Sequence, residues 1–248
     1  MAKVRHVAYI VQEPKKLYDY YHALFGLEQV RLSPTGSIHV VDGLFNLAFL
    51  QKQAVDTQVV GTHRADGTEA NQTLGINHFG FVVDNLDAVL DRLDDSIKRG
   101  ESPQNGRPAE MRIIDSWGNN FDLSTRGFLA PEERTPMGVR HVAINAANPE
   151  ETARFYESVL ELRRVRTRDD GSIVLTDGDV SLALTPEQPI GRPGIQYVGV
   201  QVEDWAATEA RFEDLGIDLP SPKLGEHEVR LSDPEGNLYV ISERGWAE

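Results

Sequence analysis

The chain has 248 residues, enough for one large domain or two ordinary ones, and its 39 acidic against 25 basic residues give a net charge of −14. This charge argues against a nucleic-acid partner, which needs clustered Lys and Arg, and against binding to an anionic membrane surface. There are no cysteines, which excludes disulfides, thiolate metal ligands and a cysteine nucleophile.

The amino-terminal apolar run is too short for a signal peptide, because it meets a proline at position 14. No apolar run approaches the roughly 20 residues that span a bilayer. We therefore expect a cytoplasmic protein.

The first quarter of the chain predicts one strand, one helix and a hairpin. Residues 4–10 (VRHVAYI) are apolar and β-branched, as in a strand, and 14–25 (PKKLYDYYHALF) have the apolar spacing of an amphipathic helix. Two further strand-like runs, 37–41 and 44–51, flank Asp42-Gly43, a dipeptide typical of hairpin turns. The order is βαβββ.

The second quarter repeats this order. Residues 76–83 (INHFGFVV) indicate a strand, and 86–100 (LDAVLDRLDDSIKRG) indicate a helix. Two short strands, 111–115 and 119–124, surround a Trp-Gly-Asn turn.

The second half of the chain repeats the first. VRHVA occurs at 4–8 and again at 139–143, an offset of 135 residues that also aligns Asp42-Gly43 with Asp177-Gly178. GINHFGFVVDN at 75–85 matches GIQYVGVQVED at 194–204. Such internal repetition predicts two homologous halves of two βαβββ modules each, joined near the polar segment 129–137.

These repeats resemble the vicinal oxygen chelate superfamily, which includes glyoxalase I, bleomycin-resistance proteins and extradiol dioxygenases. The resemblance rests on VRHVA, INHFGF, YYHALFGLEQV, FYESVLELRRV, SWGNNFDLS and DPEGNLYVIS, and it covers nearly the whole chain. It implies an α+β fold in which four βαβββ modules form two cupped-sheet domains, 1–128 and 137–248. In this family the concave face of such a sheet holds a metal ion.

The resemblance implies three metal ligands: His6, His78 and Asp122. Two histidines and one carboxylate suit non-haem Fe(II), with Mn(II), Zn(II) and Ni(II) as alternatives, because they leave coordination positions open. Strand alternation places Asp122 on the same face as Asn120 and Ser124, the polar face expected to line a cavity. The alternative is that both histidines are hydrogen-bonded core residues and Asp122 is a surface carboxylate.

The second half is expected to be metal-free. His141 matches His6, but Tyr197 stands at the position of His78 and Val240 at that of Asp122. His141 is then a relic or a packed polar residue. If modules instead pair across the halves, His141 replaces His6 in the metal site; we prefer pairing of contiguous modules.

Four modules with one metal site resemble the extradiol ring-cleaving dioxygenases, which implies a catechol-like or related oxygen-rich aromatic substrate. Three features depart from the common enzymes of that type. The metal site lies in the first half, Phe45 and Asn46 stand where their acid/base histidine would be expected, and Arg112 replaces their tyrosine.

Two further residues are candidates for catalysis. A buried Arg112 near the metal would bind an anionic substrate group; alternatively it is structural, since Arg230 matches it in the second half. His39 would act as an acid/base if it points inward; otherwise it is an exposed strand histidine. We expect His22 to be structural and His63 to lie in a solvated loop.

Two other functions stay open. One is a metal-dependent glyoxalase- or epimerase-like isomerase or lyase, whose relatives usually have a fourth ligand; only Asn46 and Gln51 offer one in 44–51. The other is a non-catalytic small-molecule-binding protein. The expected partner is a small-molecule substrate, and the oligomeric state, including a homo-oligomer, is left open.

Overall fold

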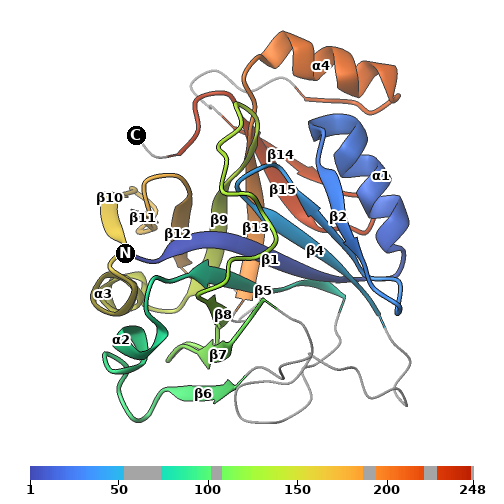
Figure 1. The fold of residues 1–248 in the computed structure, drawn as a ribbon. Helices are drawn as coiled ribbons and strands as arrows, with labels where there is room; N and C mark the ends of the chain where they lie inside the picture. The colour runs from blue at the N-terminus through green and yellow to red at the C-terminus, as the bar shows by residue number, and fades with distance from the viewer. Residues whose placement is uncertain (53–73, 102–107, 187–193, 221–227, 247–248) are drawn as a thin grey trace.

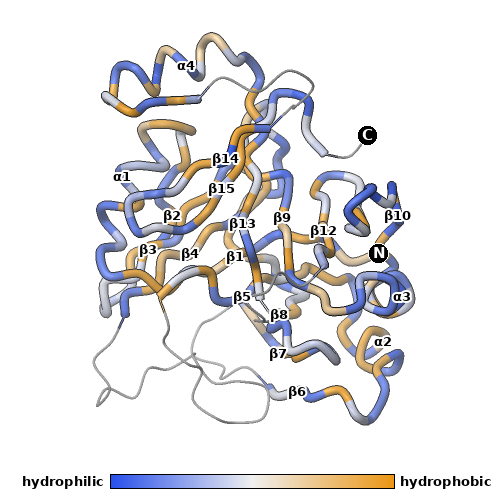
Figure 2. Tube along the Cα trace, turned by 180° about the vertical axis from the view of Figure 1, so that it is seen from behind, coloured by the Kyte–Doolittle hydropathy of each residue, from blue (hydrophilic) through white to orange (hydrophobic). Residues whose placement is uncertain are grey.

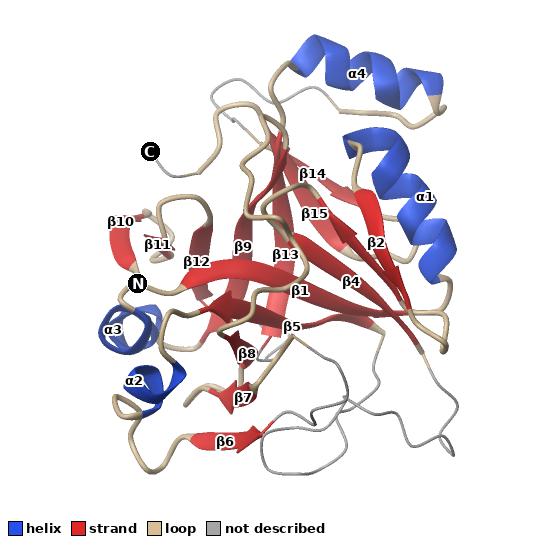
Figure 3. Ribbon diagram, viewed as in Figure 1, coloured by secondary structure: helices blue, strands red, loops and turns tan. Residues whose placement is uncertain are grey.

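The computed structural model describes residues 1–52, 74–101, 108–186, 194–220 and 228–246. They form two mixed β-sheets, one from each half of the chain, with four helices beside them (Figures 1 and 3). The first sheet has the order β2-β3-β4-β1-β5-β8-β7-β6 and the second β10-β11-β12-β9-β13-β15-β14. The predicted α+β class is confirmed.

The strands of the first sheet are β1 (Lys3–Val11), β2 (Glu28–Leu32), β3 (Ile38–Val41), β4 (Asn46–Gln51), β5 (Gly75–Val82), β6 (Lys98–Glu101), β7 (Met111–Ile114) and β8 (Asn120–Ser124). Those of the second are β9 (Gly138–Ala146), β10 (Arg163–Thr167), β11 (Ile173–Thr176), β12 (Ser181–Pro186), β13 (Gly194–Gln201), β14 (Val229–Ser232) and β15 (Leu238–Ser242). The first three modules have βαβββ order, and the described part of the fourth is βαββ.

The helices are α1 (Pro14–Phe25), α2 (Leu86–Leu90), α3 (Pro149–Leu160) and α4 (Trp205–Asp214). The prediction of a helix over 86–100 was wrong in extent, because α2 ends at Leu90 and β6 begins at Lys98. Acidic residues crowd the intervening segment, and the Asp94 carboxylate accepts a hydrogen bond from the Ser96 amide, which favours a turn. None of the described helices has the length and apolar character needed to cross a membrane.

The modules pair within each half, as preferred. In the first sheet β1 runs parallel to β4 and antiparallel to β5, so one strand joins both modules. In the second sheet β9 makes the matching pairings with β12 and β13. His6 therefore lies in the same sheet as His78, and His141 lies in the other sheet.

The two sheets share one hydrophobic core, and each half contributes a helix that packs on the other half. Tyr21 of α1 lies 5.9 Å from Tyr239 of β15 between ring centroids, and Tyr156 of α3 lies 5.9 Å from Phe121 of β8. A single cluster of buried apolar side chains contains residues of both halves. Hydrophobic residues accordingly run along the central strands of both sheets (Figure 2). The halves are therefore parts of one packed unit.

Two aspartates, one from each half, join the halves through matching contacts. Asp177 follows β11, and one of its carboxylate oxygens accepts hydrogen bonds from the Val4 amide at 2.6 Å and from Arg5 at 2.9 Å. Asp42 follows β3 and accepts from the Val139 amide and from Arg140, the latter at 3.0 Å. Because these contacts are reciprocal, we call the four charged side chains the cross-half clasp.

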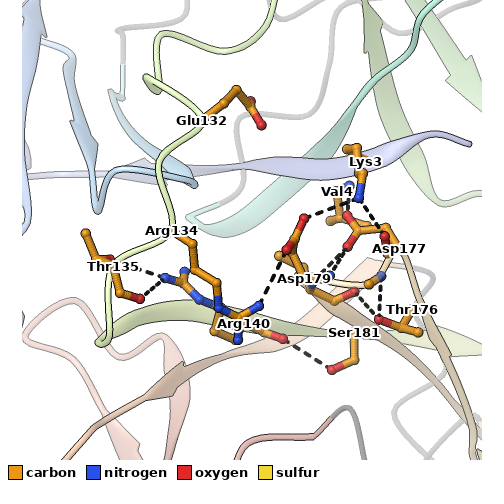
Figure 4. Close-up of polar contacts among 12 residues, drawn as sticks. Lys3, Val4, Glu132, Arg134, Thr135, Arg140, Thr176, Asp177, Asp179 and Ser181 are labelled. Atoms are coloured by element: carbon orange, nitrogen blue, oxygen red, sulfur yellow. Dashed lines mark hydrogen bonds and ion pairs between the residues drawn. The ribbon is translucent and has the colours of Figure 1, made fainter.

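The clasp is buried and is part of a larger polar network. The other oxygen of Asp177 accepts from backbone amides of its own hairpin, so the carboxylate holds its turn as well as the other half. Figure 4 shows Asp177 beside Lys3 and Val4, and Arg140 beside Thr135. The side chains of Arg5 and Asp177 are 3% and 0% exposed. Removing one partner leaves the other charge buried, which is costly.

We predict that Asp177→Asn lowers the free energy of unfolding by about 3 kcal/mol. The loss stays in the lower part of the range for buried pairs because Glu132 and Asp179 still contact Arg5. The measurement is urea-induced unfolding. The control is Asp19→Asn, which breaks an exposed pair with Lys15 and should cost under about 0.5 kcal/mol. Equal, small losses in both variants would contradict a stabilising clasp.

Candidate functional site

His6 occupies the centre of the first sheet, on the face opposite the shared core; we call this face of either sheet the site face. The imidazole Nδ1 lies 2.8 Å from the Asn46 Oδ1 of β4, the cross-strand neighbour of His6. The Phe128 ring stacks on the imidazole with centroids 4.8 Å apart and planes 3° from parallel. Gly80, opposite His6 on β5, makes room for this stack, since a Cβ there would lie 2.6 Å from Phe128.

His78 and Asp122 lie beside His6 on the same face. The centroids of the two imidazoles are 5.5 Å apart, and His78 Nε2 lies 3.4 Å from Asp122 Oδ2. His78 Nδ1 lies 2.8 Å from the Asn77 side-chain oxygen. In His6 the Asn46 amide oxygen thus accepts from Nδ1, which leaves Nε2 as the nitrogen with a lone pair. His78 has the Asn77 oxygen at Nδ1 and the Asp122 carboxylate at Nε2. All three side chains are buried, so a surface carboxylate at position 122 is ruled out.

Arg112 forms a bidentate ion pair with Asp122. Arg112 Nε donates to Oδ1 at 2.6 Å and Nη2 donates to Oδ2 at 2.8 Å. The two residues are directly opposite each other on β7 and β8, which explains the alignment of fork and carboxylate. The guanidinium is buried and lies at the position that corresponds to the tyrosine of the common extradiol enzymes. It therefore neutralises the one carboxylate of the site.

The electrostatics of the site follow from burial and from this ion pair. Burial lowers the pKa of His6 to about 3, and the nearby His78 and His39 add to the effect. Burial on its own would raise the pKa of Asp122, but Arg112 and His78 hold it well below its usual range. The site at neutral pH therefore contains a neutral His6 imidazole, a carboxylate and a guanidinium.

The three side chains fit a divalent ion in the kind and orientation of their donors. Each imidazole has its Nδ1 hydrogen-bonded to an amide oxygen, the arrangement that orients a metal-binding histidine. Their spacing does not yet match a metal site. Within the described residues, no three His, Asp or Glu side chains are gathered closely enough to hold an ion. Arg112 accounts for part of this, since it contacts both oxygens of Asp122.

The remaining candidate histidines have different surroundings. His39 is half-buried on the site face, with Nδ1 3.4 Å from the Asn46 oxygen that also serves His6. An exposed strand position is therefore excluded for His39. His22 Nδ1 contacts the Leu27 carbonyl at 2.9 Å, a local contact at the end of α1. His63 lies outside the described residues.

The second half carries a matching but different site face. His141 Nδ1 lies 3.2 Å from Ser181 Oγ, and the Trp246 ring stacks on the imidazole with centroids 4.8 Å apart. Tyr197 and Val240 are buried nearby, in an apolar cluster separate from the shared core. His141 is thus a packed polar residue, and this face has no carboxylate at the position of Asp122.

Sequence reasoning missed the supporting residues Asn46 and Phe128. From the sequence, Asn46 is a candidate fourth metal ligand and stands near the expected acid/base position, whereas the structure uses its oxygen to orient His6. The signal was available, because Asn46 stands at the same distance from His6 as Ser181 does from His141, and both accept from the histidine. Phe128 and Trp246 likewise follow β8 and β15 at equal distances.

We predict that the metal-free protein loses stability as the pH falls from about 6.5 toward 4. The folded-state pKa of His6 is below the unfolded value, so the unfolded state binds the proton first and stability declines by up to about 1.4 kcal/mol per pH unit. Urea unfolding in EDTA at several pH values measures the slope. His6→Gln should reduce it, whereas His22→Gln, at a half-exposed position, should not. An unchanged slope in His6→Gln would contradict the assignment.

The structure resembles solved structures of several enzymes. The 2,3-dioxygenase LapB from Pseudomonas sp. KL28 matches with a TM-score of 0.69 at 14% identity, over 99% of this chain and 93% of that one. A Mn(II)-bound glyoxalase from Novosphingobium aromaticivorans matches at 0.69 and 16%, over 98% and 83%. A mutant 4-hydroxymandelate synthase from Streptomyces coelicolor matches at 0.67 and 16%, over 99% and 94%. At these identities the likeness shows the fold.

No curated protein sequence in the comparison matches this chain. Two sequence profiles of one superfamily do match, one over residues 5–133 and the other over 138–241. Together they include both sheets and both copies of the repeat. The chain therefore belongs to the glyoxalase/bleomycin resistance protein/dioxygenase superfamily, with one domain of that family in each half.

Proposed function

We propose that this protein is an enzyme that uses one divalent metal ion, held by His6, His78 and Asp122, to act on an oxygen-rich small molecule. The observation that carries the proposal is the pair of buried imidazoles, each with its Nδ1 bonded to an amide oxygen, beside a buried carboxylate on one site face. The matching face of the second half keeps only one of the three, His141. A general structural need for buried polar residues would not favour one half in this way.

A ring-cleaving dioxygenase with Fe(II) is the reaction that this donor set favours. Neither Asn46 nor Gln51 supports a fourth ligand, because the Asn46 oxygen accepts from His6 and Gln51 lies at the far end of β4, opposite Val11 and not His6. Three protein ligands leave open positions for both substrate and O₂. The likeness to LapB is consistent with this choice, and the Mn(II)-bound glyoxalase keeps isomerase or lyase chemistry as the alternative.

The chemistry supplied by a bound ion at this position is polarisation of paired substrate oxygens and, for Fe(II), activation of O₂. The chain's own residues then have separate roles. Asn46 and Asn77 orient the two imidazoles through Nδ1. His39, on the same face, is placed to exchange a proton with a substrate hydroxyl through its imidazole. Phe128 covers His6 and excludes water from it.

Arg112 links metal binding to substrate binding in this proposal. Arg112 would share Asp122 with a bound ion, because its Nε and Nη2 contact both carboxylate oxygens. Its planar fork would be able to bind an anionic group of the substrate in two contacts. The same ion pair also favours a second candidate function, a metal-free small-molecule-binding protein, in which Arg112 and Asp122 stay paired.

We predict that the metal-free protein binds one divalent ion per chain and that His6→Phe abolishes this binding. The phenyl ring keeps the stack on Phe128 but removes both nitrogen donors. The matched control is His141→Phe, the same change at the same motif of the second half, and it should bind the ion as the unaltered protein does. Calorimetric titration with Fe(II) under anaerobic conditions, and with Mn(II), is the measurement. Loss in both variants, or in neither, contradicts the assigned ligands.

We also predict that Arg112→Gln binds the ion about tenfold more tightly, because the competing guanidinium is gone, and is less active on anionic substrates. The assay is oxygen consumption with a panel of catechols that carry or lack a carboxylate. Consumption that depends on Fe(II) supports the dioxygenase. Metal-dependent turnover of other substrates without oxygen uptake moves the assignment to an isomerase or lyase. Absence of metal binding in the unaltered protein leaves the small-molecule-binding function.

A further inference from the structure

The site face of the second sheet carries a buried hydrogen-bond acceptor that has no partner in the part of the chain that the structure describes. The Ser181 hydroxyl donates to the Arg140 carbonyl at 3.2 Å, so Ser181 Oγ accepts from His141 Nδ1–H. The other ring nitrogen, Nε2, then carries a lone pair, and among the described residues it has no hydrogen-bond partner although His141 is completely buried. A buried acceptor of this kind is uncommon and indicates a position for a donor that the described part of the chain does not supply.

Three arginines surround this histidine and its neighbour Tyr197. Burial lowers the pKa of His141 most, and Arg168 and Arg166 at the end of β10 lower it further through their charge. The guanidinium carbon of Arg230, on β14, lies 5.0 Å from the centroid of the Tyr197 ring. β10 and β14 are the two edges of the second sheet, so the cations approach from opposite sides. Glu228 near Tyr197 and Asp170 near Arg168 offset part of this positive charge, and the remaining guanidinium charge attracts an anion.

The surface of the second sheet between the arginines, here called the floor, is lined by apolar and aromatic side chains. Ala143, Val174, Ala183, Tyr197, Val240 and Trp246 form a cluster that is separate from the shared core. Trp246 covers the floor by stacking on His141, and its indole nitrogen donates to Glu228 at 2.7 Å. Gly199 makes room for the indole, since a Cβ there would lie 2.7 Å from it. Trp246 therefore occupies a place where a flat ring packs on the His141 imidazole, beside Tyr197.

We propose that the site face of the second half binds a small aromatic carboxylate bearing a hydroxyl group, which displaces the Trp246 side chain. The hydroxyl donates to His141 Nε2, the ring packs against Tyr197 and Val240, and the carboxylate pairs with Arg168 and Arg230. The first sheet has carboxylate Asp122 beside Arg112, whereas the second has Val240 beside Arg230, so here the cation is not neutralised by its cross-strand partner. This site needs no metal ion and does not depend on the function proposed for the first half.

The test is binding of 4-hydroxybenzoate to the full chain in EDTA, followed by calorimetry and by tryptophan fluorescence. We expect saturable binding with a fluorescence change that disappears in Trp246→Phe. Arg168→Gln and Arg230→Gln, both outside the core, should each weaken binding about tenfold, and 4-hydroxybenzyl alcohol and benzoate should bind more weakly than 4-hydroxybenzoate because each lacks one group.

The matched controls are His6→Phe and Arg112→Gln, which alter the first site face and should leave this binding unchanged. This separates the present proposal from the metal site: if the unaltered protein binds 4-hydroxybenzoate but no divalent ion, only the metal site proposed for the first half is contradicted. Any of three results would overturn the proposal. The unaltered protein does not bind 4-hydroxybenzoate, the Arg168 and Arg230 variants bind it as tightly as the unaltered protein, or the first-face controls lose this binding.

Discussion

The structure depends on the cross-half clasp, in which the Asp of each hairpin binds the Arg of the other half's VRHVA motif. Asp177 binds Arg5, and Asp42 binds Arg140. The arginine directly precedes the histidine of the same motif, so alternation along the strand sends one side chain to the other half and the next to the site face. The Asp177–Arg5 pair of the clasp therefore fixes the strand that presents His6, and the Asp42–Arg140 pair fixes the strand that presents His141.

This arrangement explains why the motif occurs twice although only one half has the candidate metal ligands. The arginine and the aspartate are needed in both halves, because each half supplies one partner of each ion pair. The histidine is free of that constraint, and its surroundings differ: beside His6 are His78 and Asp122, whereas beside His141 are Tyr197 and an aromatic cover. Structural identity at the interface thus coexists with different chemistry on the two site faces.

The arginine opposite β8 or β15 shows how one position takes different roles. Arg112 and Arg230 occupy the same place in the ladder, each opposite the residue that is Asp122 in one half and Val240 in the other. With a carboxylate available, the guanidinium forms a buried bidentate pair. Without one, Arg230 lies over the Tyr197 ring. The neighbour decides whether the cation is neutralised or attracts another anion.

Much of the fold was predictable, because it depends on local pattern and on repetition. The strands around VRHVA and the Asp-Gly hairpins follow from short-range signals, and the offset of 135 residues relates the halves. The error in the extent of α2 has a local cause as well: apolar spacing continues past Leu90, but side-chain hydrogen bonding near Asp94 favours a turn. Periodicity does not report that competition.

By itself, the sequence determined the family, the βαβββ modules, and the positions at which His6, His78 and Asp122 stand. Only the tertiary structure decided which partners these residues have. The Arg112–Asp122 pair, the Asn46 support of His6 and the cross-half clasp all join residues from different strands, and the clasp joins opposite halves of the chain. Such contacts depend on strand register and on side-chain direction, which no local pattern specifies.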